Sequence, residues 1–315
     1  MQSNFSEAVV HGLSSSPKRL PYDFLFDEEG IRLFKEIRSM PEYYQAACEM
    51  RIFQTHAQDM VALLNKPGLQ IIEKGTGDTS GIYYFLKILS TENKDIVYRP
   101  FDNSGDLLKE TEKTIKKRLP DLAVKPVHGE FFSALETSEE NEVSAPKLIL
   151  IPDSRIGNSN YQDALSFFKR LFRALNTGDN VLVGIDLKKT PSLILPAHSD
   201  PEGITARFNL NLLERINREL GGHFNTNNFK HYASYEPESG EVKNYLIAQK
   251  EQEVLIEKLN RSFHFGIWEN VQVEISKKYS PEEFRQLITE AGFTWVEAYY
   301  DPELFFMEVV LVKGL

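Results

Sequence analysis

The chain of 315 residues is acidic, with a net charge of −10, and 41% of its residues are hydrophobic. Nucleic acid and anionic membrane surfaces require basic partners, so neither is an expected ligand, and no apolar run is long enough to cross a membrane. The one cysteine, Cys48, excludes an intrachain disulfide, and neither a cysteine cluster nor a His-Glu-x-x-His motif offers a zinc site. We therefore expect a cytoplasmic protein without a metal site, and we expect a monomer, although the sequence itself does not give the oligomeric state.

The N-terminal part is expected to consist of a polar arm followed by two helices. The arm covers residues 1–23, and apolar side chains at helical spacing predict a first helix over 27–38. This helix must end near Met40, because Pro41 disfavours helix at the residue before it. The second helix is predicted over 47–64.

Strands then alternate with helices, which predicts a parallel sheet of α/β type. A polar, acidic loop is expected at 136–146. The expected strands cover 69–73, 95–100, 122–127, 147–151 and 181–187, and the expected helices cover 79–90, 103–118 and 161–175.

The alternation ends after Lys188, where residues 189–203 are rich in Pro, Ser, Asp and Gly. A helix over 204–220 precedes a predicted meander of antiparallel strands over 229–235, 241–249, 253–257, 261–266 and 271–276. Ser280, Pro281 and Glu283 then have the residue types and spacing of a helix N-cap, N1 and N3. Two last strands, over 293–300 and 305–313, are expected to close the first sheet.

This change of pattern predicts two discontinuous domains. The nucleotide-binding domain would comprise 48–188 and 278–315. The substrate-binding domain would comprise 1–47 and the insertion 189–277.

The most informative motif is the turn Glu73-Lys74-Gly75-Thr76-Gly77, which follows a buried strand and precedes a helix. Glycines allow a ligand to approach the backbone, and Asp102, at the end of the next strand, is placed to bind ribose hydroxyls. The third glycine of a dinucleotide motif and the lysine of a P-loop are missing. A nucleoside that carries a carboxylate, such as S-adenosylmethionine, therefore fits better than a pyrophosphate, although such turns also occur for structural reasons alone.

At this point the chain resembles a known family, the histidine-specific, S-adenosylmethionine-dependent methyltransferases of ergothioneine biosynthesis. The resemblance extends from about residue 18 to residue 315. It rests on Phe26-Asp27-x-x-Gly30, Leu33-Phe34, Met40-Pro41-Glu42-Tyr43-Tyr44, Glu73-x-Gly75-x-Gly77, Pro100-Phe101-Asp102, Gly129-Glu130-Phe131, Ser154-x-Ile156-Gly157-Asn158, Phe208-Asn209, Asn217-Arg218-Glu219-Leu220 and Glu274-Ile275-Ser276-x-Lys278.

The resemblance implies an α/β fold. A Rossmann-like class I methyltransferase domain would bind S-adenosylmethionine, and the N-terminus and the insertion would form a second, α+β domain. The implied cofactor residues are Glu73, Gly75 and Gly77 at the methionine part, Asp102 at the ribose, Glu130 and Phe131 at the adenine, and Asp153 on the cofactor loop.

The resemblance also implies the substrate residues. Tyr43 and Asn158 would hold the amino-acid backbone and act as the catalytic residues, while Glu274 and Ser276 would face the imidazole ring. Several positions depart from the family: Phe26 and His198 replace substrate-facing tyrosines, Asn244 replaces a methionine near the ring pocket, Lys74 replaces a leucine, and Asp153 replaces a glycine.

The residues themselves allow two interpretations. Glu274 and Ser276 are two residues apart on a predicted strand, so their side chains lie on the same face of the sheet. In one interpretation they bind the two nitrogens of a ring. In the other they are ordinary polar residues on the exposed face of an antiparallel sheet. Asn158 follows a strand at the ligand-binding edge of the sheet, but asparagine also favours turns and N-caps. His198 could bind a substrate carboxylate or lie on a solvated loop.

We therefore hypothesise a methyltransferase that acts on the α-amino group of a small amino acid, with histidine as the leading candidate. One alternative is a methyltransferase for a different amino acid or amine, with a pocket reshaped by Phe26, His198 and Asn244. Another is a non-catalytic ligand-binding relative whose cofactor site is degraded by Lys74 and Asp153. A nicotinamide dehydrogenase is a third alternative.

Overall fold

The computed structural model describes residues 5–75, 80–136 and 145–314 of the chain. Two compact units are formed, each from two segments of sequence. Unit 1 comprises residues 1–44 and 188–278, and unit 2 comprises residues 45–187 and 279–315.

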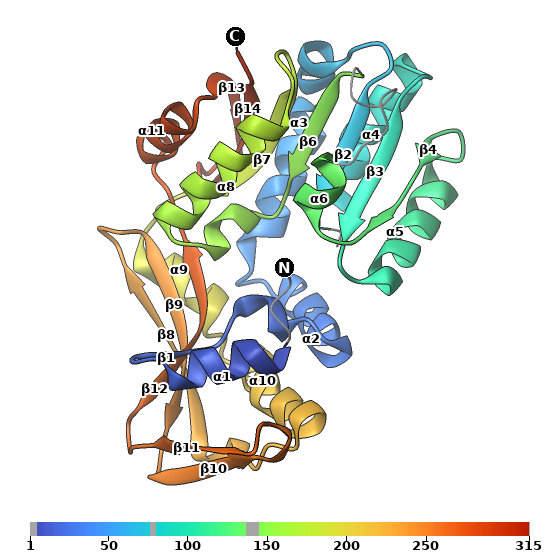
Figure 1. The fold of residues 1–315 in the computed structure, drawn as a ribbon. Helices are drawn as coiled ribbons and strands as arrows, with labels where there is room; N and C mark the ends of the chain where they lie inside the picture. Colours follow the sequence, from blue (N-terminus) through green and yellow to red (C-terminus); the bar gives the residue numbers. More distant parts are fainter. Residues whose placement is uncertain (1–4, 76–79, 137–144, 315) are drawn as a thin grey trace. The chain divides into compact units, whose positions relative to one another are not determined.

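Unit 2 is built on a central, mostly parallel sheet (Figure 1). Its strands lie in the order β13-β14-β7-β6-β2-β3-β4, and β5 pairs with β3. Strands β13 and β14 are antiparallel to their neighbours, so the last two strands of the chain close this sheet as predicted. The bounds are β2 Gln70–Lys74, β3 Val97–Asp102, β4 Ala123–Val124, β5 Val127–His128, β6 Lys147–Ile151, β7 Asn180–Asp186, β13 Thr294–Tyr300 and β14 Phe306–Val312.

Helices cover both faces of this sheet. In Figure 1, α6, α8 and α11 lie in front of the strands, and α3 and α4 lie behind them. The apolar stripe predicted on α8 is buried, and its Phe168 packs edge-on against Phe284 of α11 with ring centroids 5.9 Å apart. The bounds are α3 Tyr44–Leu64, α4 Ser80–Glu92, α5 Gly105–Arg118, α6 Phe131–Glu136, η2 Arg155–Asn158, α8 Tyr161–Ala174 and α11 Pro281–Ala291.

Strand β2 lies between β3 and β6, and the three strands are parallel. Their carboxyl ends therefore lie at one edge of the sheet, at the point where the strand order reverses, and ligands of open α/β sheets bind at such a point. Gly75 directly follows β2, Asp102 is the last residue of β3, and Asp153 comes two residues after the end of β6. The fold thus brings predicted cofactor residues from three separate segments to the same edge of the sheet.

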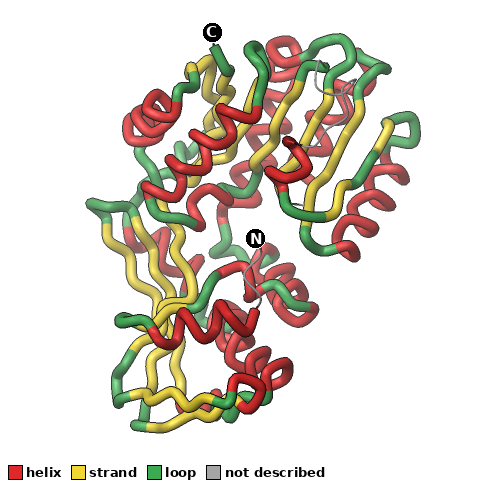
Figure 2. The backbone as a smooth tube through the Cα atoms, in the orientation of Figure 1, coloured by secondary structure: helices red, strands yellow, loops and turns green. Residues whose placement is uncertain are grey.

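Unit 1 contains a four-stranded sheet in the order β1-β12-β9-β8 and a separate hairpin of β10 and β11. Figure 2 shows these strands in yellow with the helices of the unit in red. The bounds of the strands are β1 Lys18–Arg19, β8 Phe229–Glu236, β9 Glu241–Ala248, β10 Gln252–Ile256, β11 Arg261–Phe265 and β12 Asn270–Lys277. The bounds of the helices are α1 Phe5–Ser14, η1 Tyr22–Leu25, α2 Glu28–Arg38, α9 Pro191–His198, α10 Ile204–Leu220, η3 Thr226–Asn228 and η4 Glu257–Leu259.

Several details of the sequence interpretation were wrong. The polar arm contains α1, which buries Ala8, Val9 and Leu13. The Pro-rich segment contains α9, in which Pro191 occupies the first turn, where proline is tolerated. The predicted strand 122–127 is two short strands, β4 and β5, separated by Lys125 and Pro126, and proline has no backbone N–H to donate to a ladder.

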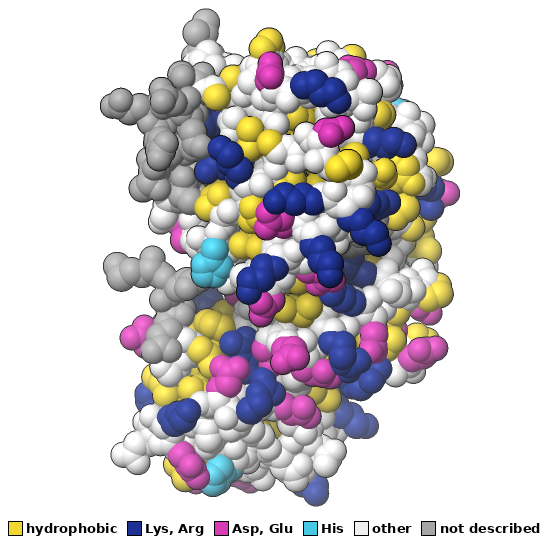
Figure 3. Space-filling view, turned by 90° about the vertical axis from the view of Figure 1, so that its right-hand side faces the viewer, with side chains coloured by type: hydrophobic (Ala, Val, Ile, Leu, Met, Phe, Trp, Pro, Cys, Tyr) yellow, Lys and Arg dark blue, Asp and Glu magenta, His cyan; other side chains and the backbone are white. Residues whose placement is uncertain are grey.

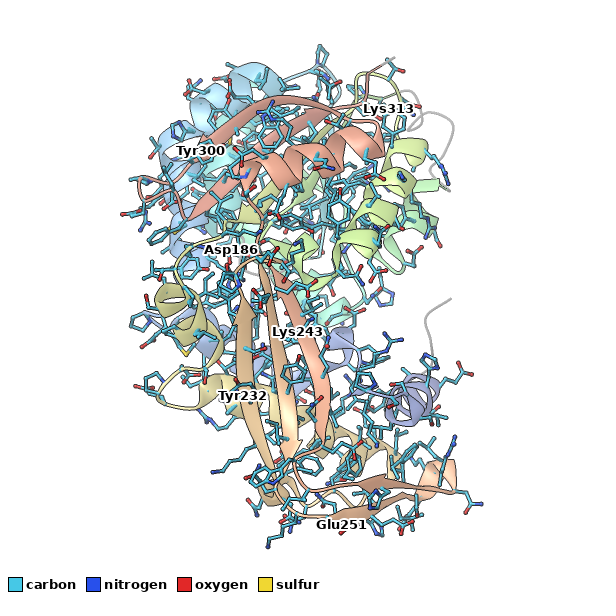
Figure 4. All side chains as sticks on the ribbon, turned by 90° about the vertical axis from the view of Figure 1, so that its left-hand side faces the viewer. Asp186, Tyr232, Lys243, Glu251, Tyr300 and Lys313 are labelled. Carbon is cyan, nitrogen blue, oxygen red and sulfur yellow. The ribbon has the colours of Figure 1, made fainter. Side chains whose placement is uncertain are left out.

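The predicted meander was wrong in part. Strands β8, β9 and β12 form an antiparallel sheet, but β10 and β11 pair only with each other, as a hairpin between β9 and β12. Figure 4 labels Tyr232 on β8, Lys243 on β9 and Glu251 at the start of the hairpin. Of the predicted acidic loop 136–146, residues 137–144 lie outside the described part of the chain.

The surface carries both signs of charge. On the face drawn in Figure 3, the described Lys and Arg side chains are interspersed with Asp and Glu side chains. Within 5–75, 80–136 and 145–314, no helix combines the length and the apolar composition of a membrane span.

Candidate active site

The first half of the predicted glycine turn has the backbone geometry of a close ligand approach. Strand β2 ends at Lys74, and Gly75 adopts a left-handed conformation with φ of 79°. Its N–H donates to the carbonyl oxygen of Phe101 on β3 (2.8 Å), which fixes the turn. Gly77 lies outside the described residues.

Glu73, the carboxylate next to this turn, is 2% exposed. It accepts a hydrogen bond from the hydroxyl group of Tyr98 on β3. Burial raises the pKa of Glu73 to about 7, although the hydrogen bond from Tyr98 and the charge of Arg155 both oppose this rise. A carboxylate in this state is suited to a cationic ligand group, whose charge would stabilise its ionised form.

Asp102, the predicted ribose ligand, ends β3 and is half-buried. Its Oδ1 accepts a hydrogen bond from the backbone N–H of Ser104 (2.8 Å), which orients the carboxylate at the edge of the sheet. A carboxylate in this position accepts hydrogen bonds from ribose hydroxyls in related folds, and this role of Asp102 stays a prediction.

Glu130 and Phe131 have structural partners of their own. The Glu130 carboxylate caps α6 by accepting from the backbone N–H and the hydroxyl group of Ser133 (2.7 and 2.8 Å), and these bonds lower its pKa. Phe131 is 8% exposed and packs edge-on against Phe101, with ring centroids 5.7 Å apart. Their contact with adenine remains a prediction.

The loop after β6 has an unusual backbone. Asp153 and Ser154 are consecutive non-glycine residues in the left-handed region, with φ of 61° and 51°. This conformation costs roughly 1–2 kcal/mol for such residues, and the family's glycine at position 153 would avoid it. Because the cost is retained here, hydrogen bonds must hold the loop in place.

Two buried carboxylate residues anchor this loop. Glu49 accepts a hydrogen bond from the backbone N–H of Asp153 (2.7 Å), and the backbone N–H of Asp186 donates to Oγ of Ser154 (2.9 Å). Asp186, labelled at the end of β7 in Figure 4, is fully buried and accepts from Nε2 of Gln45 (2.6 Å). The loop is thus fixed from α3 on one side and β7 on the other.

Arg155 and Asn158 follow in the short helix η2. The Arg155 guanidinium lies against Gly75 and 3.7 Å from the Asp153 carboxylate. Asn158 is the last residue of η2 and is half-buried. The sequence interpretation had no role for Arg155, although it stands within the Ser154-x-Ile156-Gly157-Asn158 motif.

Lys74 does not pair with Glu73, its neighbour on the strand. Successive residues of a strand face opposite sides of the sheet, and the Lys74 ammonium lies over the ring of Phe167 on α8, 5.5 Å from its centroid. This orientation removes the reason to expect a cation against the sulfonium of S-adenosylmethionine.

The predicted ring-binding residues form a buried polar network in unit 1. Glu274 on β12 and Asn244 on β9 are cross-strand partners, and Nδ2 of Asn244 donates to Oε2 of Glu274 (2.6 Å). A shift of register between Gln272 and Glu274 marks a bulge in β12 just before this pair, and bulges often re-aim side chains near active sites. Burial raises the pKa of Glu274 to about 7, against the effects of Asn244 and Lys278.

Lys278 and two histidines complete the network. The Lys278 ammonium is fully buried, donates to Oγ of Ser276 (2.9 Å) and lies 3.3 Å from Nε2 of His198. Asn244 contacts Nδ1 of His198 (3.4 Å) and Nε2 of His231 (2.9 Å). His198 is 6% exposed and ends α9, so it does not lie on a solvated loop.

Phe26 and Tyr43 belong to one aromatic cluster in unit 1. The ring of Phe34 lies 5.3 Å from that of Phe26 and 6.2 Å from that of Tyr43. Phe208 of α10 packs against both Phe26 and Phe34. The cluster joins η1, α2 and α10, and it brings Phe26 and Tyr43 to one side of the α2 helix.

Metal ligation finds no support among the residues that the structure describes. No group of three or more His, Cys, Asp or Glu side chains there has the arrangement to hold a metal ion. The donor set at the edge of the unit 2 sheet instead fits S-adenosylmethionine: a left-handed glycine, a buried carboxylate and a guanidinium at the turn, and a second carboxylate after β3.

The sheet order of unit 2 and the glycine turn at its switch point define a class I methyltransferase fold. The model of the family described as "Histidine-specific methyltransferase, SAM-dependent" matches residues 5–313. The chain belongs to this family of S-adenosylmethionine-dependent methyltransferases.

The chain is similar to several curated proteins. A histidine N-alpha-methyltransferase of Mycolicibacterium smegmatis is 29% identical over 298 residues, which cover 93% of this chain and 90% of that protein. Ergothioneine biosynthesis protein 1 of Neurospora crassa is 30% identical over 291 residues, which cover 89% of this chain and 32% of that protein. A 4-dimethylallyltryptophan N-methyltransferase of Claviceps purpurea is 25% identical over 209 residues, or 63% of this chain and 60% of that protein.

Proposed function

We propose that this methyltransferase transfers methyl groups from S-adenosylmethionine to the α-amino nitrogen of histidine. The observation that carries the proposal is the pair of Glu274 and Ser276 in the network described above. Unit 2 would hold the cofactor, and unit 1 would bind the imidazole ring.

The hydrogen-bond donor and acceptor of this pair match those of a neutral imidazole. Glu274 accepts hydrogen bonds through a carboxylate whose Oε2 is already held by Asn244. The Ser276 oxygen accepts from the Lys278 ammonium, which directs the hydroxyl hydrogen away from the lysine. The pair then offers one acceptor and one donor, and a neutral imidazole offers one N–H donor and one nitrogen acceptor.

The methyl transfer needs no covalent nucleophile from the chain. Bound S-adenosylmethionine supplies an electrophilic methyl group; a C–N bond forms as the C–S bond breaks, and the electron pair of that bond remains on sulfur. The α-amino group of a free amino acid lies next to a carboxylate and is more basic than a peptide N-terminus, so it is largely protonated at pH 7 and must lose a proton before it attacks the methyl carbon. Orientation by the binding residues then supplies the catalytic effect, up to about 7–11 kcal/mol in favourable cases.

In this proposal, Tyr43 and Asn158 hold the amino-acid backbone of the substrate. A phenol and a carboxamide both bind ammonium and carboxylate groups by hydrogen bonds. The family match of the segments that contain them supports the assignment. We further propose that the protein is a cytoplasmic monomer, and light scattering on the purified chain would test its oligomeric state.

Calorimetric titration tests the function directly. S-adenosylhomocysteine is titrated first, and histidine is then titrated into the complex. Binding in both steps, together with a trimethylated product in mass spectra of complete reactions, is the expected result. Binding of the cofactor product without any heat from histidine would contradict the assignment of the substrate, and no binding of S-adenosylhomocysteine would contradict the proposed function itself.

A different amino acid or amine is the second candidate, and Asn244 is the observation that favours it. This fully buried amide, hydrogen-bonded to Glu274 and to His231, replaces an apolar methionine of the family. An amide beside the ring site favours a more polar substrate. A panel of amino acids with isotopically labelled S-adenosylmethionine separates the two candidates, because only the true substrate gains label.

A further inference from the structure

The side chain of Arg155 occupies a position directly over the glycine turn of unit 2. A Cβ atom built on Gly75 would stand 2.7 Å from Nη1 and 3.0 Å from Cζ of Arg155. The guanidinium therefore lies in contact with the one described glycine of the motif that admits the ligand. Any side chain at position 75 would displace it.

The charges around Arg155 are arranged in a defined way. Glu73 is buried beside the turn, and the Asp153 carboxylate lies 3.7 Å from Nη2 of Arg155. The Arg155 side chain itself is 29% exposed, so it is not sealed inside the core. Two carboxylates and one guanidinium thus meet where β2 and β6 end.

This arrangement is complementary to a free amino acid. The methionyl end of S-adenosylmethionine carries one α-ammonium and one α-carboxylate group. Carboxylates at Glu73 and Asp153 suit the ammonium, and the planar guanidinium matches a carboxylate with two parallel N–H donors. The other cation of the turn, Lys74, is directed to the ring of Phe167.

We propose that the Arg155 guanidinium binds the α-carboxylate of the methionyl end of S-adenosylmethionine, and that Arg155 thereby selects adenosyl ligands that carry an amino acid. The proposal rests on the proposed cofactor site but not on histidine as the substrate. Arg155 acts here as a binding residue of the cofactor and not as an acid or base.

The experiment compares two ligands that share the adenosine part. S-adenosylhomocysteine carries the amino-acid end, and 5′-methylthioadenosine does not. Dissociation constants for both are measured by calorimetry with the full chain as wild type, Arg155→Ala, Arg155→Lys and Arg173→Ala. Arg173 is an exposed arginine of α8 and serves as the matched control.

We expect Arg155→Ala to weaken S-adenosylhomocysteine about 10- to 100-fold, the range of a hydrogen-bonded charge pair. Binding of 5′-methylthioadenosine should change less than about twofold by the same reasoning, because it makes no such pair. Arg155→Lys should retain part of the preference, since lysine keeps the charge but loses the planar fork. Arg173→Ala should bind both ligands as the wild type does.

The ratio of the two constants within one variant makes the test independent of folding, because a misfolded fraction lowers the fitted number of binding sites equally for both ligands. An unchanged ratio in Arg155→Ala would overturn the proposal. Tighter binding of both ligands by that variant would also overturn it, since Arg155 would then obstruct the turn. Wild-type protein that binds neither ligand would instead contradict the proposed function.

Discussion

The hydroxyl group of Tyr98 donates a hydrogen bond to the buried carboxylate of Glu73. The two residues lie on adjacent parallel strands, β3 and β2, where Tyr98 pairs with Ile71 two positions before Glu73. The bond ties the carboxylate beside the glycine turn to the next strand, so the position of one proposed cofactor ligand depends on a residue that does not itself face the turn.

Replacing Tyr98 with Phe should therefore weaken binding of S-adenosylhomocysteine. Without the hydroxyl group, the pKa of Glu73 moves above its present value of about 7, because the hydrogen bond now lowers it. Loss of one hydrogen bond to a charged group predicts a roughly 10-fold weaker dissociation constant at pH 7, with recovery at higher pH. Calorimetry between pH 6 and 9 measures this. Tyr161→Phe on α8 is the control, and equal pH profiles for the two variants would contradict the expectation.

Asp153→Gly should stabilise unit 2. Asp153 has a φ of 61°, and a left-handed conformation is favourable for glycine but costs other residues roughly 1–2 kcal/mol. The greater flexibility of glycine in the unfolded chain offsets part of this gain, so we expect a net increase of about 1 kcal/mol or less in the free energy of unfolding. Urea denaturation gives the value.

Asp153→Ala is the matched variant, because it removes the same carboxylate and keeps the Cβ atom. It should be less stable than Asp153→Gly. If the alanine variant proves as stable as the glycine variant, the backbone conformation is not the cause of the effect.

Glu308 makes the stability dependent on pH. It is 1% exposed on β14, and both burial and the neighbouring carboxylate of Glu49 raise its pKa well above 4.5. A raised pKa in the folded state contributes stability that is complete below about pH 4.5 and is lost as the pH rises through the folded value. The glutamine of Glu308→Gln cannot ionise, so this variant should not lose stability in the same way. We expect the free energy of unfolding of the variant minus that of the wild type to increase as the pH rises.

Urea denaturation at pH 5, 7 and 9 checks this difference. Glu297→Gln, on the neighbouring strand β13, is an exposed control. A difference between Glu308→Gln and the wild type that stays constant from pH 5 to pH 9 would count against a protonated Glu308.

Lys278→Met should weaken the binding of histidine and leave the binding of S-adenosylhomocysteine unchanged. Methionine has a similar length, but it cannot donate to Oγ of Ser276 as the Lys278 ammonium does. The hydroxyl group loses its fixed orientation, and a loss of about 10-fold in histidine affinity is expected for one misaligned hydrogen bond. Titration of histidine into the protein saturated with S-adenosylhomocysteine measures it.

Lys243→Met is the control for this variant. Lys243, labelled on β9 in Figure 4, pairs with Glu241 and is partly exposed. Equal histidine affinities for the two variants would show that Lys278 does not orient Ser276.

Ser280→Ala should cost about 1 kcal/mol of stability, the usual value for loss of an N-cap. Ser280 accepts from the backbone N–H of Glu283, and the Glu283 side chain accepts from the backbone N–H of Ser280, so α11 begins with a complete capping box. Denaturation of this variant beside Thr289→Ala, near the other end of α11, isolates the cap. Equal losses for both variants would argue against it.

Local signals predicted the elements that they control. The cap of α11 was predicted from Ser280, Pro281 and Glu283 because the motif is contained in four residues. The apolar stripe of α8 predicted a helix over 161–175, and the helix covers Tyr161–Ala174. The rule that parallel strands end at one edge predicted that Gly75, Asp102 and the loop after β6 lie together.

Features that depend on distant partners could not be predicted. Helix α9 contains Pro196, and a proline inside a segment usually indicates the end of a helix or a kink when only the sequence is considered. The hydrogen bonds Tyr98–Glu73 and Lys278–Ser276 depend on register and on side-chain reach, which periodicity does not give. Arg155 was overlooked because its importance arises from contact with Gly75, 80 positions earlier in the chain.

The sheet of unit 1 ends on one side with only two residues, Lys18 and Arg19, which pair in parallel with Val271 and Gln272 of β12. They cover the backbone edge of the strand that continues to Glu274 and Ser276. An uncovered edge strand invites pairing with another chain, and here the backbone groups of β12 at Val271 and Gln272 already have a partner within the chain. The N-terminal segment thus occupies backbone groups of β12 just before the residues on which the proposed substrate recognition depends.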